Sequence, residues 1–373
     1  MSRRKRTFQA IAVAAAISGI LASVTIAAKA VNGPKTVPNA RHAAGGQYDK
    51  SDVLRWMSGL PHRSDRGVVS GFFGGYSGGT FSLKQTELLR KRTGHYPGLL
   101  ACDYGNWVSS DNTQVDSSCN GTLKRWWSNG GLVSVGIHMP SPTGHGFGTK
   151  LDDFADLTNT HTAVGRSWQH SLKRMGDGLS DLQKAGVVVL WRPFHEMNGD
   201  WFWWANQHPS TFKRVWAYTY DYLVNTRGLD NLIWVYAPDC SRNSNLLDYY
   251  PGKGKVDVVG LDCYTDNPSG GDGRIVRNLD RQYKQMLSLG KPFAFTEVGP
   301  RDRVDGTFNW KRWIDAIHQR YPRTTYFLAW NDKWSPTQNR NAKGLMNHPL
   351  VINRDNMDGA AGTPLHAPPV GRS

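Results

Sequence analysis

The feature that most constrains the fold of this chain is a regular alternation of short apolar runs with longer amphipathic stretches. Eight apolar runs occupy residues 68–75, 96–105, 131–139, 187–196, 231–239, 256–265, 292–299 and 324–332. Helical patterns lie between them, at residues 81–92, 168–185, 210–226, 278–289 and 308–320. Parallel strands that are buried on both faces have such apolar runs, and eight strand–helix repeats predict a closed parallel barrel.

The predicted fold is therefore of the α/β class, a single-domain (β/α)8 (TIM) barrel. An open, doubly wound sheet is the alternative, but no apolar run is followed by the G-x-G-x-x-G turn that a dinucleotide-binding sheet of that kind would need. The chain has 373 residues, with no internal linker or solenoid repeat. We expect a catalytic domain at 48–357, flanked by flexible segments at 31–47 and 358–373, which are rich in Pro, Gly and Ala.

The amino terminus has the layout of a secretory signal peptide. The basic run SRRKR at residues 2–6 precedes an apolar stretch at 8–28, and Ala28-Lys29-Ala30 forms an A-x-A cleavage site. We predict that residues 1–30 are removed and that the protein is secreted, a retained membrane anchor being the alternative. Cleavage lowers the formal charge from +15 to +10, and the remaining basic residues are scattered, so we expect no nucleic-acid partner and no membrane association after cleavage.

Four cysteines remain in the exported chain, at positions 102, 119, 240 and 263. Export permits disulfides, and of the three possible pairings Cys102–Cys119 with Cys240–Cys263 closes the shortest loops. There is no C-x-x-C pair and no neighbouring set of histidines, so the cysteines are expected to be structural. We predict no metal site and no cofactor.

Polar and aromatic side chains gather where the apolar runs end. They are Asp103, His138, His195, Glu196, Asp239, Tyr264, Glu297 and Trp330. The carboxyl ends of the strands form the face of a (β/α)8 barrel on which active sites are built. Solvent exposure of strand ends is a simpler explanation for Asp239, but it explains less well two glutamates that are framed by apolar residues.

These two glutamates, Glu196 and Glu297, predict glycoside hydrolysis. Glu196 ends an apolar run and precedes three Trp and a Phe, where desolvation would raise the pKa of its carboxyl group, as a general acid requires. Glu297 ends the seventh run, and strands four and seven of a barrel can bring two side chains together across its mouth. Two carboxylates that flank one bond are the minimal equipment of a glycosidase.

Three motifs in this order resemble glycoside hydrolase family 26, whose best-known members are secreted β-mannanases. The motifs are WRPFHEMNGDWFWW at 191–204, FTEVGP at 295–300 and FLAWND at 327–332. Smaller matches include NLIWVYAPD, DVVGLDCYT and NAKGLMNHPLVINR, so that the resemblance covers residues 65–355. It implies a secreted endo-β-1,4-mannanase that cleaves mannan, galactomannan or glucomannan by retaining double displacement, with carboxyl groups about 5 to 5.5 Å apart.

The resemblance also implies roles for individual residues. Glu196 would be the acid/base and Glu297 the nucleophile, with Tyr264 donating a hydrogen bond to the nucleophile and His195 bonding the substrate or holding the nucleophile. The residues expected to bind the substrate are His138, Trp201, Trp330, Phe202, Trp204 and Arg192. For Trp191 and Trp203 ordinary core packing is expected instead.

The composition agrees with a polysaccharide substrate, and we expect the enzyme to be a monomer. The chain has fifteen tryptophans, and sugar rings stack on aromatic faces, so this excess predicts a cleft that grips a sugar chain. The resemblance leaves other substrates open, because the same family contains β-1,3-xylanases and mixed-linkage glucanases.

Three further readings are weaker. The sequence GYSGG at 75–79 matches the G-x-S-x-G elbow of serine esterases and would make Ser77 a nucleophile, but it follows the first strand and no Asp–His pair completes a triad. A zinc motif H-E-x-x-H would need His at position 199, where the chain has Gly. A non-catalytic carbohydrate-binding barrel would not need both Glu196 and Glu297.

Overall fold

The structure is a computed structural model, in which the described residues all belong to one compact unit, Gly46–Ser373. The residues it describes are 49–62, 67–105, 115–144, 146–148, 150–242, 245–265, 275–276, 278–301 and 306–357. The predicted signal peptide at 1–30 and the predicted flexible segments at 31–47 and 358–373 lie outside these residues. None of the helices within them combines the length and the apolar character that a membrane span requires.

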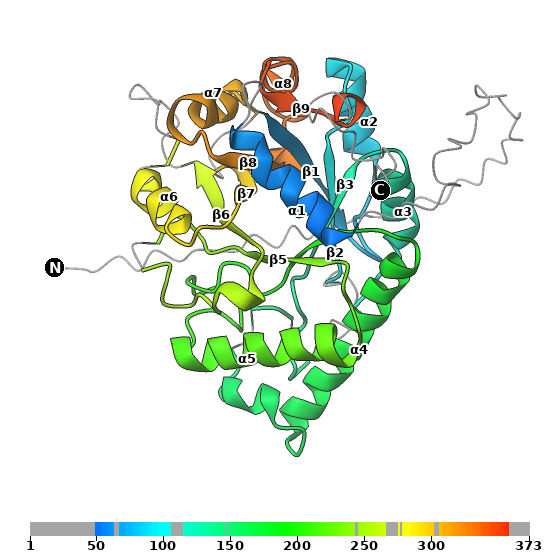
Figure 1. The fold of residues 1–373 in the computed structure, drawn as a ribbon, viewed down its shortest axis with the longest axis vertical. Helices are drawn as coiled ribbons and strands as arrows, with labels where there is room; N and C mark the ends of the chain where they lie inside the picture. Colours follow the sequence, from blue (N-terminus) through cyan, green and yellow to red (C-terminus); the bar gives the residue numbers. More distant parts are fainter. Residues whose placement is uncertain are drawn as a thin grey trace, which may run out of the picture. The chain divides into compact units, whose positions relative to one another are not determined.

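Eight parallel strands close into a barrel (Figure 1). They are β1 (Val68–Tyr76), β2 (Leu99–Asp103), β3 (Leu132–Gly136), β4 (Val189–Arg192), β5 (Leu232–Tyr236), β6 (Val258–Thr265), β7 (Phe293–Pro300) and β8 (Thr324–Ala329). Strands follow one another in chain order around the sheet, and β1 closes it by pairing with both β8 and β2. The predicted (β/α)8 barrel is confirmed, and each predicted apolar run contains one strand.

The register of the ladder places the carboxyl ends of all eight strands at one end of the barrel. Leu99 of β2 lies opposite Gly71 of β1 and Leu132 of β3, and Val189 of β4 lies opposite Leu232 of β5. A short additional strand, β9 (Val351–Ile352), pairs with the beginning of β1. Almost every strand residue is buried, which is why the strands have continuous apolar sequences.

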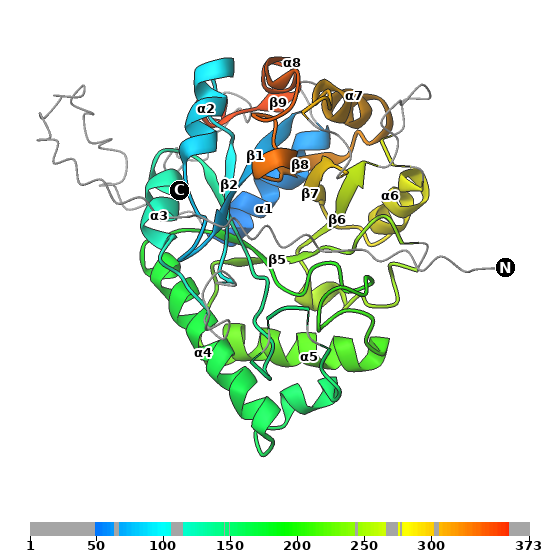
Figure 2. The same cartoon turned by 180° about the vertical axis from the view of Figure 1, so that it is seen from behind.

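Helices surround the strands (Figures 1 and 2). They are α1 (Lys50–Gly59), α2 (Lys84–Thr93), α3 (Asn120–Ser128), α4 (Ala163–Lys184), α5 (Pro209–Asp221), α6 (Leu279–Leu287), α7 (Lys311–Arg320) and α8 (Ala342–Met346). The five predicted helical patterns correspond to α2, α4, α5, α6 and α7. Helices α1, α3 and α8 were not predicted, although α1 and α3 are as long as the predicted α2 and α6, and α8 has only five residues. Within the described residues, the connection from β5 to β6 contains only a 3-10 turn, Lys253–Lys255.

Helix α4 shows how sequence determines these elements. The hydroxyl of Thr162 caps its first turn by accepting a hydrogen bond from the backbone N–H of Gly165 at 3.0 Å. Trp168, Leu172 and Met175 then recur at helical spacing and are buried. One apolar stripe therefore packs the helix against the barrel and leaves its opposite face polar.

The tryptophans mostly form the core, which corrects the expectation that their excess builds a sugar-binding cleft. Eight of the fifteen are almost completely buried: Trp168, Trp191, Trp203, Trp204, Trp216, Trp234, Trp310 and Trp313. Trp216 packs against Phe212 and Trp234, with ring centroids about 6 Å apart. The large indole rings fill the space between the strands and the helices, where each buries much apolar area. Core packing, expected for Trp191 and Trp203, is confirmed.

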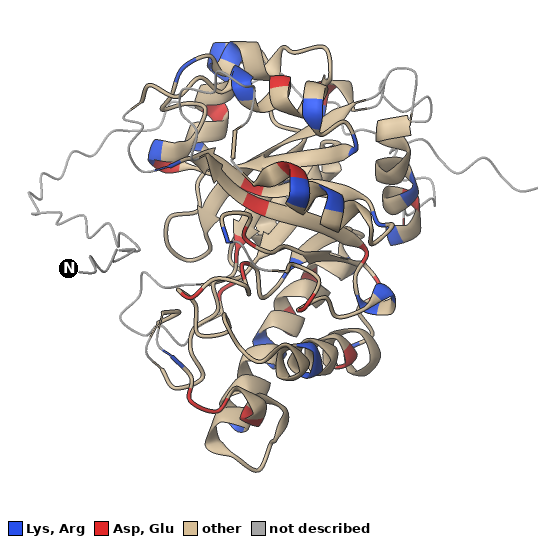
Figure 3. Ribbon diagram, turned by 90° about the vertical axis from the view of Figure 1, so that its left-hand side faces the viewer, with Lys and Arg blue, Asp and Glu red and all other residues tan. Residues whose placement is uncertain are grey.

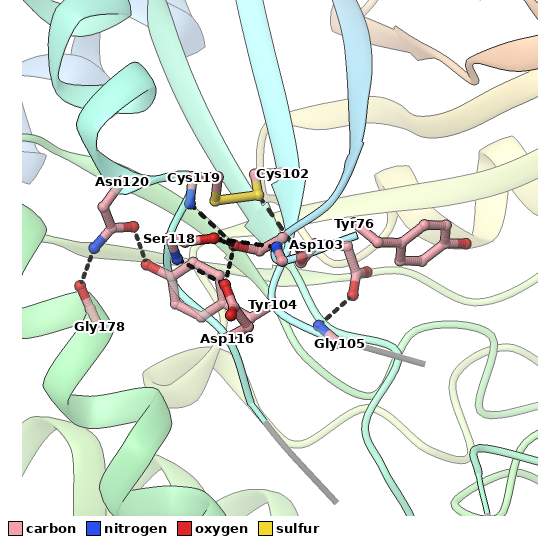
Figure 4. The surroundings of a disulfide bond; sticks show 12 residues. Tyr76, Cys102, Asp103, Tyr104, Gly105, Asp116, Ser118, Cys119, Asn120 and Gly178 are labelled. Atoms are coloured by element: carbon pink, nitrogen blue, oxygen red, sulfur yellow. Dashed lines mark hydrogen bonds between the residues drawn. A yellow bond between two sulfur atoms is a disulfide. The ribbon is translucent and has the colours of Figure 1, made fainter. Parts of the chain in front are cut away.

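Both predicted disulfides are present, Cys102–Cys119 and Cys240–Cys263. The first joins the end of β2 to the residue before α3 (Figure 4). Nearby, Tyr104 donates a hydrogen bond to Asn120, and Asn120 donates one to the carbonyl of Gly178 in α4. The second links the segment after β5 to β6. Both disulfides therefore lie at the end of the barrel where the strands terminate.

Charged residues of both signs share the outer helices (Figure 3). Lys173 pairs with Asp177 within α4, and Lys124 of α3 pairs with Asp181 of α4. Such pairs balance part of the positive charge locally.

Candidate active site

The predicted site residues meet at the carboxyl ends of the strands, around a buried arginine. Arg192, the last residue of β4, donates from Nη1 to Asp262 Oδ2 at 2.5 Å and from Nη2 to Glu297 Oε2 at 2.9 Å. It is 3% exposed, so both ion pairs are shielded from water. Burial by itself opposes the charge of the guanidinium, but the carboxylates of Asp262 and Glu297 raise the pKa of Arg192 above its ordinary value.

Glu297 is held on both of its oxygens. While Arg192 occupies Oε2, the hydroxyl of Tyr264 donates to Oε1 at 2.6 Å. Burial and the adjacent Glu297 raise the pKa of Tyr264 well above its ordinary value, so the phenol stays a donor. A cation and a hydroxyl both stabilise a carboxylate in its charged form, and charged hydrogen bonds are the strong ones. Both carboxylate oxygens of Glu297 thus accept hydrogen bonds from side chains of other strands.

Asp262 of β6 is the third member of the hydrogen-bond network around Arg192 and Glu297. Its second oxygen, Oδ1, accepts a hydrogen bond from the Thr296 hydroxyl at 2.6 Å, and the side chain is fully buried. Burial raises the pKa of Asp262, while Arg192 acts in the opposite direction. Sequence reasoning missed Asp262, because it lies within the apolar run of β6 and nothing local shows its partner seventy positions away.

Glu196 lies in a tight loop after β4 whose backbone is unusual. Phe194 and Glu196 both have positive φ, 50° and 54°, a conformation that residues other than glycine rarely adopt. The loop is tied to the next strand by a hydrogen bond from the Glu196 N–H to the carbonyl of Ala237 at 2.7 Å. Tertiary contacts therefore impose the conformation that directs the carboxyl group of Glu196, and such strain is typical of functional sites.

The surroundings of Glu196 favour its protonated form. Burial raises its pKa well above the ordinary value, and the negative charges of Glu297, Asp239 and Asp262 increase the rise. The indole of Trp201 donates to Glu196 Oε2 at 2.5 Å and acts in the opposite direction. The two glutamates thus differ, since one is paired with a cation and the other is buried among carboxylates.

Two histidines and an aspartate form a chain beside the glutamates. Asp103, fully buried at the end of β2, accepts from Nδ1 of His138 at 2.7 Å and from its backbone N–H at 2.8 Å. Nε2 of His138 then lies 3.2 Å from Nε2 of His195. Burial and the nearby Arg192 lower the pKa of His195, so it is neutral. Both ring nitrogens of His138 are thus engaged within the protein, and a ligand would have to compete for Nε2.

The predicted aromatic residues differ in their exposure. Trp330 stacks on Phe73 with ring centroids 3.8 Å apart, and Phe202 stacks on Trp204 at 4.3 Å. Trp204 itself is fully buried, and its indole donates to the carbonyl of His195. Its ring therefore supports its neighbours and has no surface for a ligand. Trp201 is half-buried, with the guanidinium of Arg242 over its ring.

Two residues near the histidines were not among the predicted binding residues. Phe147, from the segment between β3 and α4, contacts His138 and Phe202 edge-on, with ring centroids 5.7 and 5.5 Å apart. The ring of Tyr76, the last residue of β1, also contacts that of His138 edge-on, with centroids 5.3 Å apart. No local pattern identifies either one. The end of β1 and the segment after β3 come near each other because β2 pairs with both β1 and β3.

Ser77 lacks the environment of an esterase nucleophile. It is fully buried, its hydroxyl donates to Asp116 at 2.7 Å, and the same oxygen accepts from the N–H of Cys119. These bonds make Ser77 part of the turn structure around the Cys102–Cys119 disulfide. Within the described residues, no group of three or more His, Cys, Asp or Glu side chains is arranged to hold a metal ion.

Two surface hollows, of about 300 and 510 Å³, lie at the opposite end of the barrel. Their linings include Lys291 and Pro292, which precede β7, and Val187 and Asp230, which precede β4 and β5. They are therefore separate from the cluster of carboxylates and aromatic rings.

The chain also matches known proteins. The sequence model described as Glycosyl hydrolase family 26 matches residues 44–356. A mannan endo-1,4-beta-mannosidase of Bacillus subtilis strain 168 is 40% identical over 336 residues, which cover 86% of this chain and 90% of that protein. The mannan endo-1,4-beta-mannosidase A and B of Caldalkalibacillus mannanilyticus is 42% identical over 355 residues, which cover 91% of this chain but 66% of that protein.

Comparison with solved structures also finds mannanases similar to this chain. The Bacillus subtilis mannanase man26 superimposes with a TM-score of 0.75 at 40% identity, and the match covers 83% of this chain and 94% of the other. A mannanase called BCman, also from Bacillus subtilis, gives a TM-score of 0.75 at 39% identity with the same coverage.

Proposed function

Because the chain belongs to glycosyl hydrolase family 26, we propose that it is an endo-acting enzyme that hydrolyses internal β-1,4-mannosidic bonds of mannan, galactomannan or glucomannan. The observation that supports this most directly is the pair of glutamates in contrasting environments. Glu297 is paired with Arg192, and Glu196 is buried among carboxylates. The relatives named as mannan endo-1,4-beta-mannosidases support the choice of mannan as the substrate.

The proposed reaction is a retaining double displacement. In the first step Glu297 attacks the anomeric carbon, the glycosidic C–O bond breaks, and Glu196 transfers its proton to the departing oxygen. Tyr264 and Arg192 orient the attacking carboxylate. In the second step Glu196, now ionised, takes a proton from water, the water oxygen bonds to the anomeric carbon, and Glu297 leaves as a carboxylate. We expect the two carboxyl groups to be about 5 to 5.5 Å apart, as this mechanism requires.

The aromatic residues are proposed to bind the sugar chain. Trp330, on its Phe73 support, offers a ring beneath the sugar at the cleavage point, and Trp201 and Phe202 lie beside Glu196. His138 is proposed to contact the same sugar. Sugar rings expose C–H faces that pack on such rings, which suits a site lined by aromatic residues.

Secretion as a monomer is proposed as well. The predicted signal peptide and the two disulfides support an oxidising, extracellular environment.

The test uses the small number of glutamates. The chain has three, Glu87, Glu196 and Glu297. We expect Glu196→Ala and Glu297→Ala each to reduce mannan hydrolysis by several orders of magnitude with the fold intact by circular dichroism. Glu87→Ala is the matched control, because Glu87 lies on α2 and bonds Tyr96. Near-normal hydrolysis by either site variant would remove that residue from the mechanism.

Two further measurements test the finer assignments. The first product, followed by NMR before mutarotation, should be the β-anomer, whereas an α-anomer would refute retention. A panel of glucomannan, galactomannan, β-1,3-xylan and lichenan should show activity on the first two, and faster hydrolysis of xylan or lichenan would overturn the mannan assignment.

A further inference from the structure

Glycine at position 199 is required by the position of the Trp201 ring. A Cβ atom added to Gly199 would lie 2.7 to 2.8 Å from three atoms of the six-membered ring of Trp201, closer than real Cβ contacts. The backbone of Gly199 does not have positive φ, so alanine is acceptable to the main chain at this position. The obstacle to a side chain is therefore the indole ring alone.

The ring that lies over Gly199 is bonded to the acid/base. Nε1 of Trp201 donates to Oε2 of Glu196 at 2.5 Å. An indole N–H is a donor only, so the oxygen it contacts must be an acceptor. The carbonyl oxygen of a carboxylic acid is a stronger acceptor than its hydroxyl oxygen, so when Glu196 is protonated the indole bond favours the proton on Oε1, the oxygen that Trp201 does not contact.

We infer that Gly199 is a positioning residue, which admits the indole of Trp201 to Oε2 of Glu196 and so favours Oε1 as the position of the catalytic proton. This inference rests on the proposed role of Glu196 as general acid. Gly199 does not touch the substrate and acts only through Trp201.

Other contacts leave the indole little freedom to move elsewhere. The guanidinium of Arg242 lies over its ring, 4.9 Å from the centroid. Arg242 is itself paired with Asp200, the residue that follows Gly199. A methyl group at position 199 must therefore displace the ring against this cation or away from Glu196.

Several charged groups face Glu196 from the surrounding strands. Glu297 comes from β7, Asp262 from β6 and Asp239 from the segment after β5, and all three raise the pKa of Glu196. Arg192 of β4 also interacts with its charge. The hydrogen bond from Trp201 lowers the pKa of Glu196, opposite to the effect of these carboxylates. Loss of this bond alone should therefore raise the pKa of Glu196.

The experiment compares Gly199→Ala in two backgrounds. In the wild-type background we expect kcat/KM on mannan to fall about 10- to 100-fold, as part of the contribution of general acid catalysis is lost. In the Trp201→Phe background the smaller ring leaves room for the methyl group, so the same substitution should change kcat/KM less than about threefold. Trp201→Phe alone should move the alkaline limb of the kcat/KM profile to higher pH.

An activated aryl mannoside separates this role from a structural one. Its leaving group needs no proton, so kcat/KM on that substrate should be nearly unchanged by Gly199→Ala. Gly148→Ala is the matched control, because a Cβ there would lie at an ordinary 3.6 Å from the carbonyl oxygen of Trp201. Equal losses on both substrates, or equal losses in both backgrounds, would overturn the inference.

A second readout does not depend on mannanase activity. The free energies of unfolding of wild type, Gly199→Ala, Trp201→Phe and the double variant form a double-mutant cycle. We expect the two sites to be coupled, with Gly199→Ala destabilising wild type but not the Trp201→Phe protein. If the wild-type enzyme hydrolysed no mannan, the proposed function would fail while this cycle still tested the contact. Additive free energies would refute it.

Discussion

The buried pairing of Arg192 allows a quantitative prediction for Arg192→Met. Methionine keeps much of the volume but leaves Asp262 and Glu297 buried without their cation. Removing one partner from a buried ion pair costs about 3–5 kcal/mol, because the remaining charge is uncompensated. For about 310 folded residues the unfolding entropy is roughly 0.65 kcal/mol per degree, so Tm should fall by about 5–8 °C.

The loss should also depend on pH. Burial raises the pKa of Asp262 and Arg192 opposes this rise, so the folded-state pKa of Asp262 is higher still in Arg192→Met. Below that pKa the carboxyl group is neutral and little is lost, whereas above it an unpaired charge is buried. The difference in free energy of unfolding between variant and wild type should therefore widen from mildly acidic to mildly alkaline buffer.

Urea unfolding in both buffers, with calorimetry for Tm, measures these quantities. Lys124→Met is the control, since its ion pair with Asp181 is exposed and should contribute less than about 1 kcal/mol. Adding Asp262→Asn to Arg192→Met should recover part of the stability. A loss below about 1 kcal/mol for Arg192→Met, or one that does not change with pH, would refute the argument that these charges are shielded from water.

Three other predictions follow from the same end of the barrel. Tyr264→Phe removes the hydroxyl bonded to the proposed nucleophile and should lower kcat/KM on mannan about 10- to 150-fold, from about 1.5–3 kcal/mol for such a bond. Tyr250→Phe, whose hydroxyl has no hydrogen-bond partner among the residues that the structure describes, should leave kcat/KM unchanged. Replacing Cys240 and Cys263 by Ser opens a loop with a sequence separation of 23 and should cost about 3.4 kcal/mol of unfolding free energy in calorimetry, and an unchanged stability would contradict this. Glu196→Gln should be more stable than wild type in alkaline but not in acidic buffer, because the raised pKa of Glu196 means that stability is lost as pH rises through it; equal stabilities at both pH values would contradict this.

The fold was predictable because its determinants are local. Each strand is a continuous apolar run, and the long helices have strong amphipathic periodicity, so that α4 and α5 could be recognised without knowledge of their neighbours. Helix α3 was not recognised, although it has the same length as α6. The disulfide pairing was also accessible, since loop lengths alone favoured it.

The site was predictable only in part, because only some of its determinants are local in the sequence. Glu196 and Glu297 are recognisable because each interrupts an apolar run. The partners that tune them come from other strands, and the sequence does not show that Asp103 or Asp262 faces inward. The number of tryptophans was misleading as well, because the sequence does not distinguish a tryptophan that packs in the core from one that faces a ligand. Trp204 is buried beneath residues that it was expected to join at the surface.

The backbone at Phe194 and Glu196 has a consequence for protein engineering. Positive φ at two non-glycine residues costs about 1–3 kcal/mol each when nothing compensates it. In this protein the compensation comes from the residue that follows β5, through the hydrogen bond from the Glu196 N–H to the carbonyl of Ala237. A graft of residues 193–204 onto another barrel would transfer the amino-acid sequence without the hydrogen bond to Ala237. The loop would then relax to a backbone without the positive φ angles. Any transplant of this activity must therefore include the neighbouring strand as part of the motif.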